Sequence, residues 1–431
     1  MSAPRGRIIA TATAAFMLIV LAATPAHAAP GDIDPTFGGG DGIVGIDRGD
    51  TDAGQKVLVL PNGKFLLAGQ GGNFPDTDLL LARFTKDGEP DATFGGGDGV
   101  VTVDFFGGFD DMFGLNRMPD GRIVVAGHAQ DAHDTSDRVA VARFKPNGLL
   151  DHSFSGDGKA TAAIPGLGFS AAWRSLVQPN GKVVLVGNAE PEPGEPGDLI
   201  AVRLNVDGTF DSGFNGDGRF VLDLGGDDGA WDVRTLPNGD LLAVGWSNLT
   251  DEGRIALVWL TPSGHLDPGE GGGDGRTLID LVPNNATEFA RAVFVLPSGK
   301  LLIVGNADRA VRPKSKGDVF EARLKANGLR DTSFGGGDGW VACDGGGSDE
   351  LVLGARRGTD GSMVVAGTSD LGFFVARLKP NGAADHSFGT NGFAKTFPPS
   401  SRANDAVILG NGKILVATDV SHDAAAVRLL G

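Results

Sequence analysis

The feature that most constrains the fold is a short phrase, an apolar run around Pro-Asn-Gly or a close variant, that occurs seven times. Its closing glycine falls at Gly63, Gly121, Gly181, Gly239, Gly299, Gly361 and Gly412. A second phrase, Asp-x-x-Phe, begins at Asp34, Asp91, Asp151, Asp211, Asp267, Asp331 and Asp385. Repetition of this kind is typical of folds built by copying one supersecondary unit.

Each copy predicts four short strands. In the first copy "QKVLVLP" and "KFLLAGQ" flank Asn62 and Gly63, and a glycine with positive φ suits the tight turn of a hairpin. "DLLLARF" gives a third strand, and residues 100–104 give a fourth. The strands are nearly continuous in Val, Leu, Ile and Phe, which indicates sheets buried on both faces.

The ends of the chain distinguish a closed ring from a linear solenoid. The first Asp-x-x-Phe phrase precedes any hairpin, whereas the last hairpin, at Gly412, is followed by only one further strand. Residues 33–46 therefore supply the missing fourth strand of the last copy. We expect an all-β, seven-bladed β-propeller of four-stranded blades, closed by an N-terminal strand that completes the last blade.

The repeating unit, with "PNGK", "ARL" and "D-x-x-FG" in fixed order, resembles the delta-60 repeat of bacterial exported proteins and the broader class of NHL-like propellers. The resemblance covers essentially the whole chain after residue 28. It implies a β-propeller of largely uncharacterised function and no catalytic residues. Two departures, Trp259 for the usual arginine and Glu270 for the usual phenylalanine, indicate one modified blade boundary.

Residues 1–28 read as a Sec-type signal peptide, with Arg5 and Arg7 before an apolar stretch and "AHA" before the expected cleavage site. We expect residues 29–431 to form a single propeller domain that is secreted as a monomer. No later segment is long and apolar enough to span a membrane. The single cysteine, Cys343, allows no internal disulfide, and the net charge of −17 disfavours nucleic acid as a partner.

A recurring arginine precedes the recurring aspartate by eight residues in most copies. We predict that the two form structural ion pairs, because a site that recurs in every blade is unlike an active site, which is normally single. The pairs are Arg83 with Asp91, Arg143 with Asp151, Arg203 with Asp211, Arg323 with Asp331, and Arg377 with Asp385; Arg428 holds the same position in the last copy.

Two features raise the question of a metal ion. The "GGGDG" clusters, such as the one at Asp98, make calcium a candidate ion, although each offers one carboxylate and a glycine-rich turn is the alternative. His128, Asp131, His133 and Asp134 lie in one polar loop and are a weak candidate for a zinc site, with an ordinary flexible loop as the alternative. We predict no cofactor.

Insertions between copies fall on one face of the predicted propeller, where the second-to-third loops and the crossovers lie. Trp173, Trp231 and Trp246 are candidate platforms there for a sugar ring or a peptide, with core packing as the alternative. The sequence favours an exported binding or scaffold module for a protein or carbohydrate ligand. A hydrolase or lyase with a metal or carboxylate site in the central channel, and a calcium-stabilised structural surface protein, stay open as alternatives. We find no catalytic residues, so an enzyme is the less favoured reading.

Overall fold

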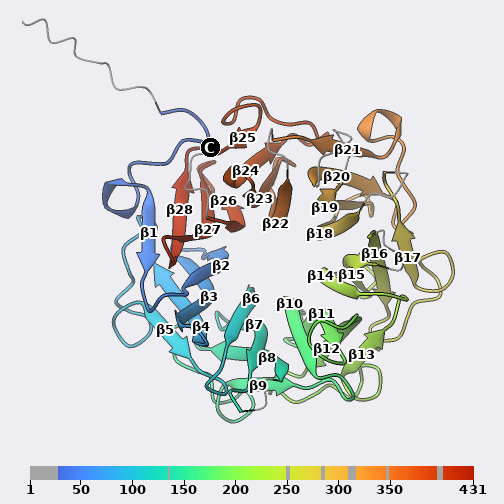
Figure 1. The fold of residues 1–431 in the computed structure, drawn as a ribbon, viewed down its shortest axis with the longest axis horizontal. Coiled ribbons are helices and arrows are strands. Elements are labelled where there is room, and N and C mark those ends of the chain that lie inside the picture. Colours follow the sequence, from blue (N-terminus) through green and yellow to red (C-terminus); the bar gives the residue numbers. More distant parts are fainter. Residues whose placement is uncertain are drawn as a thin grey trace, which may run out of the picture.

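Seven four-stranded antiparallel sheets surround a central axis in the computed structural model (Figure 1). The structure describes residues 28–133, 136–248, 253–282, 287–308, 317–345, 349–395 and 401–431. The predicted signal peptide lies almost wholly outside these residues. In each sheet the first strand of the repeat lies nearest the axis, and the fourth lies at the rim. The predicted fold class is confirmed.

The strands of the seven blades have the following bounds. Blade 1 contains β2 (Ala53–Val59), β3 (Phe65–Asn73), β4 (Asp76–Phe84) and β5 (Val100–Val103). Blade 2 contains β6 (Asp110–Arg117), β7 (Ile123–Gln130), β8 (Asp137–Phe144) and β9 (Lys159–Ala162). Blade 3 contains β10 (Phe169–Val177), β11 (Val183–Glu190), β12 (Asp198–Leu204) and β13 (Arg219–Leu222). Blade 4 contains β14 (Asp228–Thr235), β15 (Leu241–Ser247), β16 (Arg254–Leu260) and β17 (Arg276–Ile279).

Blade 5 contains β18 (Glu288–Val295), β19 (Leu301–Ala307), β20 (Asp318–Leu324) and β21 (Trp340–Cys343). Blade 6 contains β22 (Glu350–Arg357), β23 (Met363–Ser369), β24 (Gly372–Leu378) and β25 (Phe393–Ala394). Blade 7 contains β26 (Ala403–Ile408), β27 (Ile414–Val420), β28 (Asp423–Leu429) and β1 (Ile43–Ile46). Two short 3-10 helices, η1 (Gly38–Gly40) and η2 (Gly335–Gly337), lie within "GGGDG" clusters.

The N-terminal strand closes the ring as expected. β1 pairs antiparallel with β28, with Ile43 opposite Val427 and Ile46 opposite Ala424. The pairing continues beyond the strand, because Gly31 N donates to the Leu430 carbonyl at 2.8 Å. Blade 7 therefore joins the two ends of the described chain in one sheet.

The core lies between the blades. Leu79, Leu80 and Leu81 are consecutive in β4, and all three are fully buried, because each face of a blade packs against a neighbouring blade. Leu79 and Leu81 belong to the cluster shared with blade 2, and Leu80 to the cluster shared with blade 7. Burial on both faces explains why these strands lack the alternation of a sheet with one solvent face.

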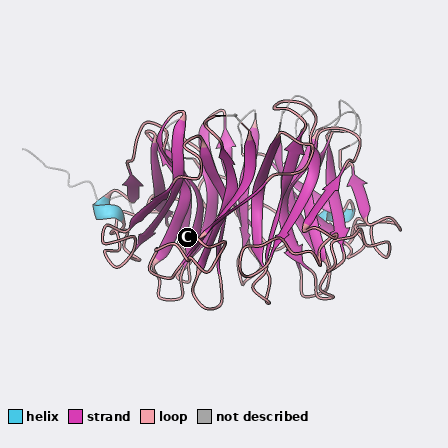
Figure 2. Ribbon diagram, turned by 90° about the horizontal axis from the view of Figure 1, so that it is seen from below, coloured by secondary structure: helices cyan, strands magenta, loops and turns pink. Residues whose placement is uncertain are grey.

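The strands run between two different faces of the disk (Figure 2). The turn face carries the Pro-Asn-Gly hairpins and the third-to-fourth connections; Gly63, for example, has φ of 81° in its hairpin. The loop face carries the second-to-third loops and the crossovers between blades. Among the described residues, we find no helix that is long and apolar enough to cross a membrane.

Candidate functional site

The recurring arginines and aspartates meet on the turn face. Arg83 Nε donates to Asp91 Oδ2 at 2.6 Å. The corresponding distances are 2.8 Å for Arg143–Asp151, 2.6 Å for Arg203–Asp211, 2.6 Å for Arg323–Asp331, 2.7 Å for Arg377–Asp385 and 2.5 Å for Arg428–Asp34. The structure thus brings together every pair that the spacing predicted.

Each pair belongs to a larger unit, which we call the anchor. In blade 3, Arg203 Nη1 donates to the carbonyl of Pro262 in the next blade at 2.6 Å, and its guanidinium lies 4.6 Å from the ring centroid of Phe214. Lys182, from the "PNGK" phrase, contacts Asp211 at 2.7 Å. This lysine was not among the predicted pairs, although its recurrence in the phrase is a signal that could have revealed it. The anchor ties strand, turn and neighbouring blade together.

The two departures of blade 4 are explained by the same unit. Trp259 replaces the anchor arginine and is fully buried, and Glu270 replaces the phenylalanine on which that arginine would lie. Asp240 stands where four other copies have lysine and one has arginine. Burial raises the pKa of Asp240, and its hydrogen bond with Asp267 raises it further. Blade 4 has therefore lost the cations and the ring of its anchor together.

The "GGGDG" aspartates cap turns. Asp98 Oδ1 accepts a hydrogen bond from Val100 N at 3.0 Å, and Asp157 Oδ1 accepts one from Lys159 N at 2.9 Å. The glycines around Asp98 have positive φ, up to 126° at Gly97. This geometry supports the turn interpretation of the clusters.

The predicted zinc residues that the structure describes do not form one group. His128 is buried on β7 among the rings of Phe109, Phe113, Phe169 and Trp173, and burial lowers its pKa to about 4. His133 is exposed, and its Nδ1 lies 3.3 Å from Asp131. Asp134 lies outside the described residues. Among those described, His128, Asp131 and His133 do not converge as a group of three ligands.

A ring of seven side chains lines the central channel. Every first strand carries a β-bulge, and the extra residue of each bulge faces the channel; we call these seven residues the bulge ring. They are Gln55, Phe113, Trp173, Trp231, Arg291, Leu353 and Asn404. A bulge leaves one residue unpaired and redirects its side chain. Each bulge residue stands eight positions before the Pro-Asn-Gly glycine, so this fixed offset could have revealed the ring.

The bulge ring borders a cavity of about 550 Å³, within the usual range for small-ligand sites. Ala53, which begins β2, also lines it, as do Gln70 and Asp419 in the last halves of the second strands β3 and β27. The cavity therefore lies at the loop-face end of the channel.

One side of the cavity is aromatic. The ring centroids of Phe113 and Trp173 are 4.8 Å apart, those of Trp173 and Trp231 are 4.8 Å apart, and those of Trp231 and Trp246 are 4.7 Å apart. Trp173 Nε1 donates to Asn188 Oδ1 at 2.7 Å, which fixes that indole. Trp173 and Trp231 line the cavity, whereas Trp246 packs behind Trp231. The structure thus gathers the three predicted tryptophans in one row.

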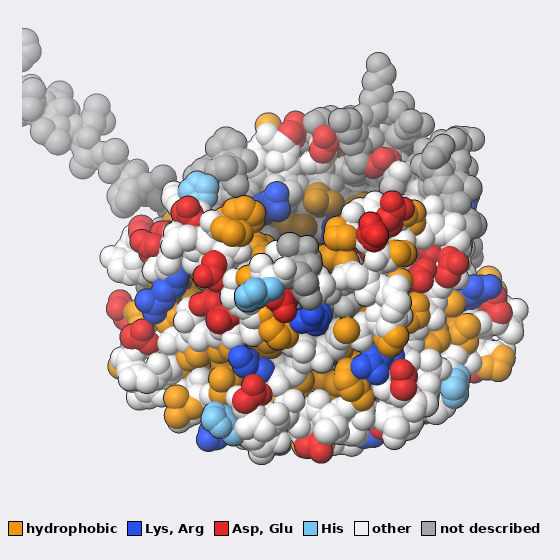
Figure 3. Space-filling view, turned by 60° about the horizontal axis from the view of Figure 1, so that its bottom comes forward, with side chains coloured by type: hydrophobic (Ala, Val, Ile, Leu, Met, Phe, Trp, Pro, Cys, Tyr) orange, Lys and Arg blue, Asp and Glu red, His pale blue; other side chains and the backbone are white. Residues whose placement is uncertain are grey.

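The adjoining side is cationic. The cavity is lined by Lys56, Arg174, Arg291 and Arg402, against the carboxylates of Asp111 and Asp419. This local excess contrasts with the chain's net charge of −17 and with its outer wall, where Figure 3 shows acidic and basic side chains interspersed. An acidic protein that concentrates cations in one cavity is suited to attract an anion there.

Arg291 differs from its neighbours. Arg174 Nε donates to Asp232 at 2.9 Å, whereas Arg291 has no carboxylate partner among the described residues. Its guanidinium lies 3.6 Å from the ring centroid of Trp231, and its buried Nε makes no hydrogen bond. Burial lowers the pKa of Arg291 to about 9, so the side chain stays charged at neutral pH.

Two further groups in the cavity titrate near neutrality. Burial raises the pKa of Asp111 to about 7. Burial also lowers the pKa of Lys56 to about 8, against the attraction of Asp405. A carboxyl and an amine with such values can exchange protons at neutral pH.

The buried acids predict a stability maximum in mildly acidic solution. Burial raises the pKa of Asp110 and Glu321 to about 8, and of Asp111 and Glu288 to about 7. Acids with raised pKa values stabilise the fold at low pH, and this contribution is lost as pH rises from about 4 to about 8. The anchor carboxylates have lowered pKa values, so their contribution is lost as pH falls below about 4.

We therefore expect the melting temperature, measured in chelator, to be highest near pH 5 and lower at pH 8 and at pH 3. Among the groups named, only His128 opposes the loss of stability between pH 5 and pH 8. Its pKa is lowered by burial, so its contribution to stability rises with pH. Glu321→Gln should weaken the loss between pH 5 and pH 8 and leave the acid side unchanged. A melting temperature that rises steadily from pH 5 to pH 8 would contradict this expectation.

A family model described as "Domain of unknown function (DUF5122) beta-propeller" matches residues 60–94, 119–154, 178–214 and 358–388. No curated protein matches the sequence. Similar solved structures include Sqt1 from Chaetomium thermophilum bound to the N-terminus of the ribosomal protein L10, with 12% identity and a TM-score of 0.45 over 89% of this chain and 98% of that chain.

Another similar structure is the polysaccharide lyase Uly1, with 12% identity and a TM-score of 0.46 over 88% of this chain and 90% of that chain. Likeness at this level carries no argument about function. The family match falls within four of the seven repeats, in blades 1, 2, 3 and 6, and supports a β-propeller family. The finer resemblance to the delta-60 repeat stays a prediction.

Proposed function

We propose that this chain is a binding module that holds an acidic saccharide at the loop-face end of its central channel. The observation that carries the proposal is Arg291, a half-buried cation that lies on the face of Trp231, has no carboxylate partner among the described residues, and has a buried Nε without a hydrogen bond. A protein gains little from burying such a group for stability alone. A ligand carboxylate or sulfate would supply the missing partner.

The neighbouring surfaces support a sugar rather than a free anion. Trp173 and Trp231 offer adjacent aromatic faces in the cavity wall, and such faces pack against the apolar face of a ring. Gln55 and Asn404 add amide donors and acceptors in the same bulge ring. The variable loops surround this end of the channel, where a rigid scaffold tolerates change. The proposal includes export through the predicted signal peptide.

The test is calorimetric titration with two trisaccharides of the same linkage, one built from uronic acids and one neutral. We expect the acidic trisaccharide to bind and the neutral one to bind at least tenfold more weakly, a difference of about 1.4 kcal/mol. Added salt should weaken the acidic ligand selectively. Equal affinity for the two ligands, or no heat with either, would overturn the proposal.

A lyase or hydrolase is the second candidate, and Asp111 with Lys56 favours it. These groups line the same cavity and have pKa values near neutrality. Prolonged incubation with the acidic trisaccharide, followed by mass spectrometry, would detect cleavage. Asp111→Asn would then have to abolish turnover while binding persisted.

A further inference from the structure

Acidic side chains recur where one blade passes to the next on the loop face. Three positions meet there. The first is the residue just before the part of the third strand that pairs with the fourth strand. The second is the residue after the fourth strand, and the third is the residue at the start of the next blade. At the junction of blades 1 and 2 they are Asp78, Asp104 and Asp110, and one carboxylate oxygen from each lies within 4.8 Å of the others. We call such a set a junction triad.

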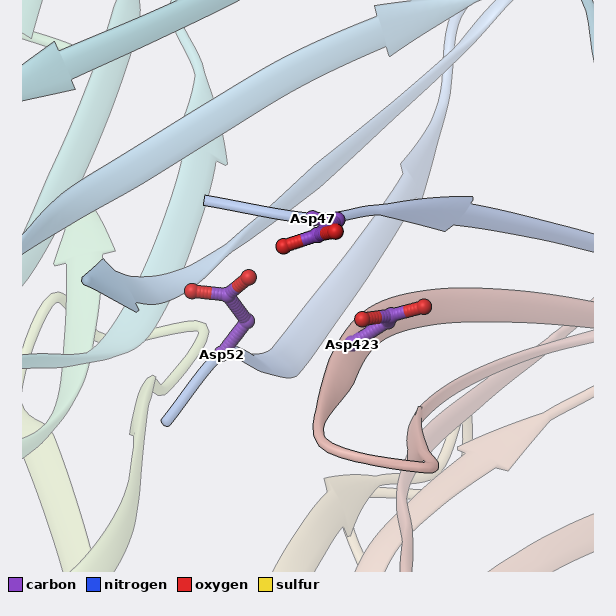
Figure 4. Close-up of side chains that lie close together, drawn as sticks. All are labelled: Asp47, Asp52 and Asp423. Atoms are coloured by element: carbon purple, nitrogen blue, oxygen red, sulfur yellow. The ribbon is translucent and has the colours of Figure 1, made fainter. Parts of the chain in front are cut away.

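The same triad occurs at other junctions. Asp423, Asp47 and Asp52 form it between blades 7 and 1, and Figure 4 shows their side chains close together. Asp318, Asp344 and Glu350 form it between blades 5 and 6. A looser fourth set, Asp198, Asp223 and Asp228, holds the same three positions between blades 3 and 4.

In the triad between blades 1 and 2, Asp110 has one carboxylate oxygen without a partner. Its side chain is fully buried, and Oδ2 accepts a hydrogen bond from Phe105 N at 3.0 Å. Oδ1 is buried without any hydrogen-bond partner in the described structure. A buried carboxylate oxygen left unpaired is costly unless a cation or a proton meets it.

The junctions without a triad carry the complementary evidence. Between blades 4 and 5, Arg254 takes the place of Asp78, and its Nη1 lies 3.1 Å from Asp280, the counterpart of Asp104. Between blades 2 and 3, Arg138 takes that place, and Ala163 and Ser170 replace the two acids. At these two junctions an arginine thus stands in place of a triad member, whereas the junction of blades 6 and 7 has Gly372 at that position. In the triad of blades 5 and 6, Lys395 Nζ lies 3.7 Å from Glu350 Oε1 and balances part of its charge.

We propose that the junction triads bind calcium ions that tie the rim strand of one blade to the first strand of the next. The donor set is entirely carboxylate oxygen, the chemistry that Ca²⁺ prefers, and each triad draws on two adjacent blades. Three carboxylates with oxygens within 4.8 Å of one another repel, and a divalent cation between them would remove that repulsion.

The main test compares thermal melting in chelator and in millimolar Ca²⁺ for the full chain. One variant changes the residue after the fourth strand at the three triads and at the looser fourth set: Asp47→Asn, Asp104→Asn, Asp344→Asn and Asp223→Asn. We expect Ca²⁺ to raise the melting temperature of the wild type by several degrees and that of this variant hardly at all. In chelator the variant should melt at or above the wild type, because it has lost like-charge repulsion.

Two single variants guard the interpretation. Asp280→Asn makes the same change at the junction that already holds Arg254, and it should keep the full calcium response. Asp78→Arg places an arginine in blade 1 at the position that Arg254 holds in blade 4. We expect this variant to fold and to bind one Ca²⁺ fewer than the wild type, as measured by equilibrium dialysis. The proposal is overturned if Ca²⁺ does no more than KCl of equal ionic strength, or if the fourfold variant or Asp78→Arg keeps the wild-type response.

Discussion

Arg203→Ala is expected to lower the free energy of unfolding by about 3 kcal/mol, the low end of the range for removing one partner of a buried ion pair. The side chain is 6% exposed and joins Asp211, the Pro262 carbonyl and the Phe214 ring. The loss stays near the low end because Lys182 still meets the Asp211 carboxylate. Equilibrium denaturation by urea measures the change.

The matched control is Lys86→Ala, which breaks an exposed pair with Asp87. Exposed pairs of this kind contribute about 0 to 1 kcal/mol. Ligand affinity should be the same in both variants, because the anchors lie on the turn face, at the end of the strands opposite the cavity. A change of less than about 1 kcal/mol for Arg203→Ala would contradict the anchor interpretation.

The fold could be predicted from the sequence because the same constraints act seven times. Every copy contains a turn glycine with positive φ, apolar strands buried on both faces and the recurring aspartate. The prediction of the fold therefore did not depend on a single motif match. The N-terminal strand was predictable for a related reason. The C-terminal copy has three strands and lacks a fourth, whereas residues 33–46 form a fourth strand without the other three. β1 accordingly pairs with β28.

The site was harder to predict because it depends on residues that differ between copies. Arg291 and Trp231 hold equivalent positions in adjacent blades, and the packing of these blades places the guanidinium 3.6 Å from the ring centroid. A bulge is a backbone irregularity without a strong signature in a single copy, so only the comparison of all seven copies, with the fixed offset of eight positions from the turn glycine, could have revealed which residues face the channel. His128 illustrates the converse error: a polar loop motif suggested a ligand, and tertiary packing buries the ring among aromatic side chains.

Arg291→Gln is expected to weaken binding of the acidic trisaccharide by about 10- to 100-fold and to leave the neutral trisaccharide unaffected. A hydrogen bond to a charged group contributes about 1.5 to 3 kcal/mol, and each 1.4 kcal/mol is tenfold in affinity. The change removes a cation that makes no ion pair in the described structure, so we expect the fold to be retained. Calorimetric titration at two salt concentrations measures the effect, which should shrink as ionic strength rises.

Trp231→Ala separates stacking from charge in the same cavity. It removes the face on which Arg291 lies and one wall of the aromatic row, so it should weaken both trisaccharides. Arg219→Gln, on the rim strand β13, removes an arginine remote from the channel and should change neither affinity. If Arg291→Gln weakened both ligands equally, the guanidinium would be supporting Trp231 rather than meeting an anion. The proposed ligand would then be a neutral saccharide, because the cavity would recognise the sugar ring by packing and not by charge.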